Sequence, residues 1–170
     1  MNGHSRGVLA GLALSCLSTA AVADSPSLIG TYKDWSAFQS SANGRKMCYV
    51  LGKPDATEPK KAKRDPIFFM ISDWPSRKAK GEVQVIPGYT YKDGGAVTAQ
   101  IGAEKFDLFT QGDKAWVEDV AREKALVAAM EKGAKLVVTG VSQRGTTTHD
   151  TYSLSGISDA LSKVHEACGM

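Results

Sequence analysis

The chain has 170 residues, with 21 basic and 18 acidic side chains and a formal net charge of +3. This length suits one domain with a substantial hydrophobic core. A charge so close to neutral argues against general nucleic-acid binding, which requires a concentrated basic face. Beyond the N-terminus no apolar run is long enough to span a bilayer, so we expect a mature protein that does not cross the membrane.

Residues 1–23 have the pattern of a cleaved secretory signal peptide. Arg6 precedes an uncharged, mostly apolar stretch, and Ala21–Ala23 (AVA) matches the small-x-small pattern that leader peptidase cuts. A membrane anchor is the alternative, but the stretch is short and rich in Ala, Gly and Ser. Cys16 also permits a lipoprotein, although the residues before it fit a lipobox poorly. We expect residues 24–170 to form one exported domain, periplasmic or secreted, in which the loss of Arg6 lowers the charge to +2.

Eight short segments of the mature chain have the composition of strands, with Gly- and Pro-containing turns between them. Segment 67–72 is continuously apolar, which is typical of a strand buried on both faces. Many short strands at close spacing favour a mainly β fold, an antiparallel β-sandwich, over an α/β fold. The expected strands are 29–38, 46–51, 67–72, 82–86, 97–101, 105–109, 114–117 and 135–141.

A long polar loop, residues 54–66, is expected between two of these strands. It contains three prolines and the basic residues Lys60, Lys61, Lys63 and Arg64. A proline-bounded polar segment without apolar anchors is typically a solvent-exposed connection, so we expect it to be dispensable for folding. The alternative is an anion contact, for example with lipopolysaccharide phosphate or another acidic surface.

Two helices are predicted among the strands, over residues 119–132 and 157–167. The first is rich in Ala and Leu, with Asp119 as its N-cap and Gly133 as its stop. The second has apolar residues at helical spacing, and Cys168 follows them on the same face. Each helix is therefore expected to place an apolar side on the sheet.

Two cysteines, Cys48 and Cys168, remain after the leader is removed. In an oxidising compartment they most simply form one disulfide. It would close a loop on the order of 120 residues, for which the chain-entropy model predicts about 4 to 5 kcal/mol of stabilisation. A metal site that joins both cysteines to His149 and His165 is the alternative, but no close ligand pair such as CxxC supports it. We expect no metal and no other cofactor.

The segment RGTTTHDTYSL, residues 144–154, concentrates hydrogen-bonding side chains. As a strand it would turn Asp150 and Tyr152 toward the core and His149 toward solvent, because successive side chains alternate between faces. A buried carboxylate is costly without a cation or several donors. Arg144 or backbone N–H groups are the expected partners of Asp150.

A small hydrolase is the enzymatic alternative for this segment. It would combine His149 and Asp150 with a serine nucleophile, Ser142 or Ser153. Adjacent strand residues point to opposite faces, so His149 and Asp150 are not expected to pair. A GxSxG elbow is absent, and residues 156–160 only imitate one. We therefore predict a protein that is not an enzyme.

Several short motifs are shared with one protein family. Arg144-Gly145-Thr146, the run DTYSL at 150–154 and a final helix ending in Cys168 resemble the invasion-associated locus B family of exported α-proteobacterial proteins. Many members have another cysteine soon after the first-strand tryptophan, whereas none follows Trp35 closely here. Further similar motifs are Asp34-Trp35, Cys48-Tyr49-Val50, Lys53-Pro54, Gly88-Tyr89, Phe106–Phe109, Ala115-Trp116, Ala129-Met130 and Val138–Ser142.

The resemblance implies an exported β-sandwich without catalytic residues. It favours a non-enzymatic envelope or secreted protein that binds an unidentified protein or envelope partner, with a role in host-cell invasion or adhesion. The alternatives are the hydrolase and an envelope-maintenance protein that associates peripherally and binds anionic glycolipid or peptidoglycan through Lys60–Arg64. The family motif is expected to form a structural network of Arg144, Gly145, Thr146, Asp150, Tyr152 and Ser153.

Overall fold

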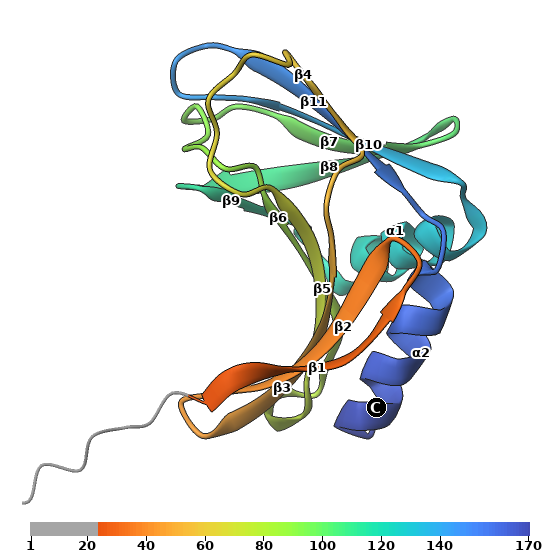
Figure 1. The fold of residues 1–170 in the computed structure, drawn as a ribbon. Coiled ribbons are helices and arrows are strands. Elements are labelled where there is room, and N and C mark those ends of the chain that lie inside the picture. The colour runs from red at the N-terminus through yellow and green to blue at the C-terminus, as the bar shows by residue number, and fades with distance from the viewer. Residues whose placement is uncertain (1–23) are drawn as a thin grey trace, which may run out of the picture.

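A computed structural model describes residues 24–170, and the predicted leader lies outside the described residues. This part of the chain forms antiparallel strands and two α-helices (Figure 1). The strands are β1 Asp24–Tyr32, β2 Trp35–Ala42, β3 Arg45–Gly52, β4 Ala56–Glu58, β5 Phe68–Trp74, β6 Ala79–Ile86, β7 Val97–Ile101, β8 Glu104–Gln111, β9 Lys114–Trp116, β10 Lys135–Val141 and β11 Thr147–Ser153. The helices are α1 Val120–Lys132 and α2 Ile157–Cys168, and a 3-10 turn covers Pro75–Arg77.

The strands form one open sheet in the order β1-β2-β3-β5-β6-β9-β8-β7-β10-β11-β4. The first residues of β8 pair with β7 and its last residues pair with β9, so β8 links the two parts of the sheet. Figure 1 shows a bent sheet, with β1, β2 and β3 in one part and β4, β10 and β11 in the other. The predicted mainly antiparallel β fold with two short helices is confirmed.

Aromatic side chains join the two parts of the bent sheet. The ring of Phe69 on β5 lies edge-on to Trp35 on β2, at 6.3 Å between ring centroids, and to Tyr152 on β11, at 5.8 Å. The Trp35 indole Nε1 donates a hydrogen bond to the carbonyl of Ser153 at 3.0 Å. All three rings are fully buried, so β11 is anchored in the same core as the N-terminal strands.

Helix α2 packs on β2 and β3, and α1 on β6. The disulfide Cys48–Cys168 ties the end of α2 to β3, so the predicted pairing is present. The imidazole Nδ1 of His165 lies 2.6 Å from a carboxylate oxygen of Asp73, which adds a polar contact between α2 and β5. Because the two cysteines are 120 residues apart, the bond restricts most of residues 24–170 in the unfolded state.

Within residues 24–170, neither helix has the length and apolar composition needed to cross a bilayer.

The sequence-based prediction differs from the structure at two places. The expected strand 29–38 is a hairpin, because the chain turns at Lys33, whose φ of 52° is a left-handed value that turns usually give to Gly or Asn. The polar loop 54–66 contains the short strand β4, which pairs with β11. A three-residue edge strand has too few residues to show a hydrophobic period.

Candidate functional site

The site is built on β11, where successive side chains alternate between core and solvent. Thr148, Asp150 and Tyr152 are buried, whereas Thr147 and His149 are exposed. The strand lies between β10 and β4, and Asp150 is paired with Thr57 of β4. Because β4 lies within the polar loop 54–66, its pairing with β11 brings this loop next to Asp150.

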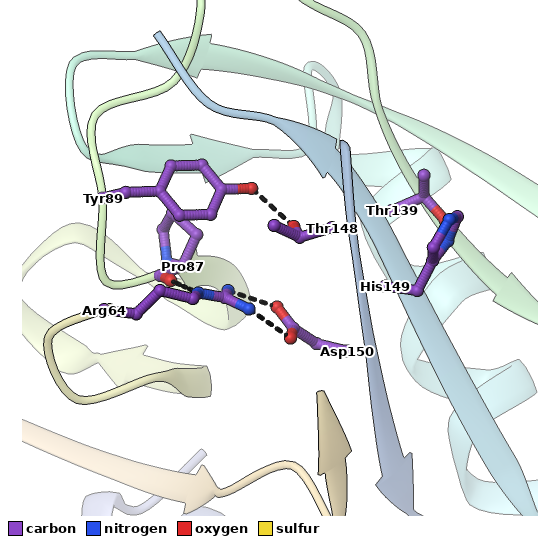
Figure 2. Close-up of polar contacts among 7 residues, drawn as sticks. All are labelled: Arg64, Pro87, Tyr89, Thr139, Thr148, His149 and Asp150. Atoms are coloured by element: carbon purple, nitrogen blue, oxygen red, sulfur yellow. Dashed lines mark hydrogen bonds and ion pairs between the residues drawn. The ribbon is translucent and has the colours of Figure 1, made fainter. Parts of the chain in front are cut away.

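Asp150 forms a bidentate ion pair with Arg64 of that loop (Figure 2). The guanidinium nitrogens Nη1 and Nη2 lie 2.6 and 2.5 Å from the two carboxylate oxygens. The side chains are 6% and 2% exposed, so water hardly reaches the pair. Such a pair needs good geometry to offset the cost of burying two charges, and two parallel N–H···O bonds provide it.

Two predictions from the sequence were wrong, one about the partner of Asp150 and one about the basic loop. Arg144 is not the partner of Asp150: it lies in the turn before β11, and its side chain is exposed and makes no ion pair within residues 24–170. The basic loop is not uniformly solvent-exposed, because Arg64 turns inward to the carboxylate. The loop is therefore expected to contribute to folding through Arg64.

Further contacts fix the guanidinium of Arg64. Its Nε donates a hydrogen bond to the carbonyl of Pro87 at 2.8 Å, and its carbon Cζ lies 4.9 Å from the ring centroid of Tyr89 (Figure 2). Burial disfavours the charge, but the hydrogen bonds and the attraction of Asp150 outweigh it, and the pKa of Arg64 is raised above its usual value. Arg64 is thus a permanently charged part of the framework.

Three tyrosines surround this ion pair. The Tyr89 hydroxyl lies 2.7 Å from the Thr148 hydroxyl, and the Tyr89 ring meets Tyr91 edge-on at 5.3 Å. The hydroxyls of Tyr91 and Tyr152 are buried and have no hydrogen-bond partner among the described residues. Burial raises the pKa of both phenols. The rings keep the ion pair in a low-dielectric setting, where its attraction is strong.

A polar pocket of about 480 Å³ opens beside the ion pair. Its walls are loop segment 62–65, loop segment 88–90 and the turn 142–146, and Thr148 also lines it. Lys63 and Arg144 contribute cations from two of these walls, and both are exposed. The basic loop thus divides into the buried Arg64, the pocket residue Lys63 and two exposed lysines, Lys60 and Lys61, that do not line the pocket.

Backbone hydrogen bonds hold the pocket walls together. The N–H of Asp65 donates to the carbonyl of Gly88 at 3.0 Å, and that of Gln143 donates to Thr90 at 2.8 Å. Gly88 has a φ of +73°, and a Cβ there would lie 2.2 Å from the Asp65 carbonyl oxygen. The approach of the first two walls therefore requires glycine at this position.

Residues 35–165 match the family model described as Invasion associated locus B (IalB) protein. The chain belongs to the invasion-associated locus B family. The match covers β11, the ion pair and all three pocket walls, and it confirms the resemblance carried by the short motifs. No curated protein and no solved structure is significantly similar to the chain.

In this IalB protein, the residues of the hydrolase alternative do not form a catalytic group. His149 lies on the opposite side of β11 from Asp150, and its Nδ1 is 3.0 Å from the Thr139 hydroxyl (Figure 2). The Ser142 hydroxyl accepts a hydrogen bond from the N–H of Thr146. Within residues 24–170, no hydrogen bond joins His149 to Asp150, Ser142 or Ser153.

The remaining predicted residues of the IalB motif have other positions. Gly145 has a φ of +83° in the turn before β11, and Thr146 is exposed there, with its carbonyl accepting a hydrogen bond from the N–H of Ser142. Ser153 ends β11, and its N–H donates to the Asp55 carboxylate at 2.8 Å. The motif therefore shapes the turn, anchors both ends of β11 and places Tyr152 near Asp150, whereas Arg64, the charged partner of Asp150, comes from another segment.

The four residues of the alternative metal site make other contacts in this structure. Cys48 and Cys168 are bonded to each other, and His165 contacts Asp73 while His149 contacts Thr139. Across the described residues, no group of three or more His, Cys, Asp or Glu residues is arranged to hold a metal ion.

Sequence reasoning missed the contact of His165 with Asp73. The Asp73 carboxylate is buried, and its second oxygen accepts a hydrogen bond from the N–H of Gly81 at 2.8 Å. The two side chains are separated by 92 residues and belong to no local motif, so spacing gave no signal.

Proposed function

We propose that this IalB chain is an exported, non-enzymatic binding protein that contacts its partner with the pocket beside Asp150. The main support for this proposal is a preformed polar pocket with a cation on each of two walls, Lys63 and Arg144. Both cations lack an ion-pair partner among the described residues. Binding pockets are typically concave and largely preformed, with a few polar groups that orient the ligand.

The chemistry of the lining favours recognition over catalysis. It includes two cations, the hydroxyls of Tyr89 and Thr148 and the amide of Gln143, all of which make directional hydrogen bonds. Among the described residues that line the pocket there is no histidine or cysteine. The one serine of this lining, Ser142, accepts a hydrogen bond from the N–H of Thr146 and makes none to a basic side chain among the described residues, so the paired nucleophile and base that acyl transfer would require are not assembled there.

The expected location supports the same proposal. Disulfides persist in the periplasm and outside the cell, and the Cys48–Cys168 bond fits that environment. The predicted leader, residues 1–23, would supply the export signal. The family description fits a role in invasion or adhesion, so a partner on a host-cell surface is the form of the proposal that we favour over an envelope partner.

Site-specific photo-crosslinking tests the proposal. A photoreactive residue at Gln143, on the pocket rim, is compared with one at Ser162, an exposed position on α2. Each mature protein is irradiated with intact host cells and, separately, with the envelope fraction of the source bacterium. The proposal predicts a discrete adduct from Gln143 and none from Ser162, and the sample that yields it locates the partner. Equal adducts from both positions, or none from either, would contradict it.

A further inference from the structure

We propose that the pocket binds the anionic end of a saccharide, a sugar that carries a carboxylate or a phosphate, with Lys63 and Arg144 contacting the anion. This inference rests on the proposed function, because it names the chemistry that the pocket recognises. The two cations come from different walls, the loop segment 62–65 and the turn 142–146. Both residues line the same pocket, so the proposal places the anion between those walls.

The charges around the pocket leave these two cations available. Arg64 also lines the pocket, but its charge is balanced by Asp150, which accepts a hydrogen bond from it at each carboxylate oxygen. Asp65 is the other carboxylate to consider, and it makes no ion pair within residues 24–170. The charges of Arg64 and Asp150 cancel. The charged residues that remain in the lining are Lys63, Arg144 and Asp65, so the lining keeps a net positive charge. The planar guanidinium of arginine can also donate two parallel hydrogen bonds to a carboxylate or a phosphate.

The rest of the lining points to a polyhydroxylated ligand and not to a bare ion. The residues Tyr89, Thr90 and Thr148, which carry hydroxyls, and Gln143, which carries an amide, line the same pocket. Hydroxyls and amides both donate and accept hydrogen bonds, as a sugar ring does. The volume of about 480 Å³ lies within the range of small-molecule sites and exceeds what one inorganic anion would fill.

The walls are also organised before a ligand arrives. The turn 142–146 is closed by hydrogen bonds from the N–H of Ser142 to the Thr146 carbonyl and from the N–H of Thr146 to the Ser142 hydroxyl, at 2.9 and 3.1 Å. The other two walls meet at Gly88, where the chains approach too closely for a side chain. A preformed pocket avoids the entropy cost of ordering loops on binding, which favours a small ligand with few contacts.

Calorimetric titration of the mature chain tests the inference. The probes are glucuronate, which presents the carboxylate of acidic polysaccharides, glucose 1-phosphate, which presents the phosphate of envelope glycolipids, neutral glucose and inorganic phosphate. We expect binding of at least one anionic sugar and much weaker binding of glucose and of inorganic phosphate. The tighter of the two anionic sugars indicates which source of saccharide the pocket serves.

Variants inside and outside the pocket separate binding in the pocket from general attraction to the basic loop. Lys63→Met and Arg144→Met each remove a pocket cation, and the double variant Lys60→Met/Lys61→Met removes two charges from the same loop outside the pocket. All four residues are exposed, so thermal melts should show each variant folded. We expect each pocket variant to weaken binding about tenfold or more, the effect of losing a charge-assisted hydrogen bond, and the double variant to leave it nearly unchanged.

Specific results overturn the inference. Equal loss in the Lys60→Met/Lys61→Met variant would show general attraction to the loop, and equal binding of inorganic phosphate would show a simple anion site. If no anionic sugar binds but the Gln143 adduct still forms, the saccharide inference fails while the proposed binding function stands. If the adduct is absent as well, both fail.

Discussion

Removal of Arg64 is expected to destabilise the protein much more than removal of any other cation of the basic loop. The Arg64 guanidinium makes three hydrogen bonds, two to Asp150 and one to the Pro87 carbonyl, and it is nearly inaccessible to water. Arg64→Ala would leave the Asp150 carboxylate buried without a cation. Breaking a buried pair in this way typically costs about 3 to 5 kcal/mol, a large part of the roughly 5 to 15 kcal/mol that stabilises a domain.

Equilibrium unfolding in urea, with the disulfide intact, measures this loss as a change in the free energy of unfolding. Arg144→Ala and His149→Ala serve as matched controls, because both side chains are exposed and flank Asp150 in sequence. Exposed substitutions usually change stability by less than about 0.5 kcal/mol. Asp150→Ala should lower the free energy of unfolding by about as much as Arg64→Ala, because it leaves the Arg64 guanidinium buried without its carboxylate.

A double variant separates the loss of the ion pair from the cost of leaving one charge buried without its partner. Arg64→Met/Asp150→Leu removes both charges, so it should be more stable than either single variant despite carrying two substitutions. An Arg64→Ala protein within about 0.5 kcal/mol of the natural chain would refute the structural role of the pair. So would an Arg144→Ala protein that loses as much stability as Arg64→Ala.

Three further predictions concern the framework around the pocket. Replacing Cys48 and Cys168 with serine should lower the free energy of unfolding by about 4 to 5 kcal/mol in urea titration, and a loss below about 1 kcal/mol would argue against a closed loop in the unfolded chain. Burial raises the pKa of the Tyr91 and Tyr152 phenols above the value of 10.0 for an exposed phenol. Their stabilising contribution is therefore complete below that pH and is lost as the pH rises toward the folded-state pKa, so part of the tyrosinate absorbance should appear together with unfolding in an alkaline titration. Full ionisation in protein that circular dichroism shows to be folded would contradict this. Gly88→Ala should lower the free energy of unfolding by more than about 1 kcal/mol in the same urea assay, because a Cβ there meets the backbone of the facing loop. An unchanged unfolding midpoint would show that the two loops can move apart at little cost.

Local patterns in the sequence predicted the elements but not the partner of Asp150. The alternation of β11 and the helical spacing of α2 are visible within a few residues, because each element buries one face. The contact of Arg64 with Asp150 joins residues 86 apart, and it forms because β4 pairs with β11. Arg64 stands in a run of lysines that looks uniformly solvated, so no local signal marks it as buried.

The pocket itself was also beyond the reach of sequence patterns. The basic loop and the segment 144–154 were each recognised as polar in the sequence, but as separate features. Three segments far apart in the chain meet through backbone hydrogen bonds at Gly88 and Thr90, and such bonds leave no trace in side-chain composition. Gly88 was noted as part of a family motif, whereas its close approach to Asp65 is a fact of three-dimensional packing.

We propose that this IalB protein binds its ligand in the pocket beside the Arg64–Asp150 pair. An NMR titration of isotope-labelled protein, residues 24–170, with glucuronate and glucose 1-phosphate gives a direct test, because each backbone amide reports its own surroundings. If the ligand binds in the pocket, the shifts should be saturable and confined to segments 62–65, 88–90 and 142–148. Shifts centred on α2 or on the exposed side of His149, or none from either sugar with the Gln143 adduct also absent, would contradict it.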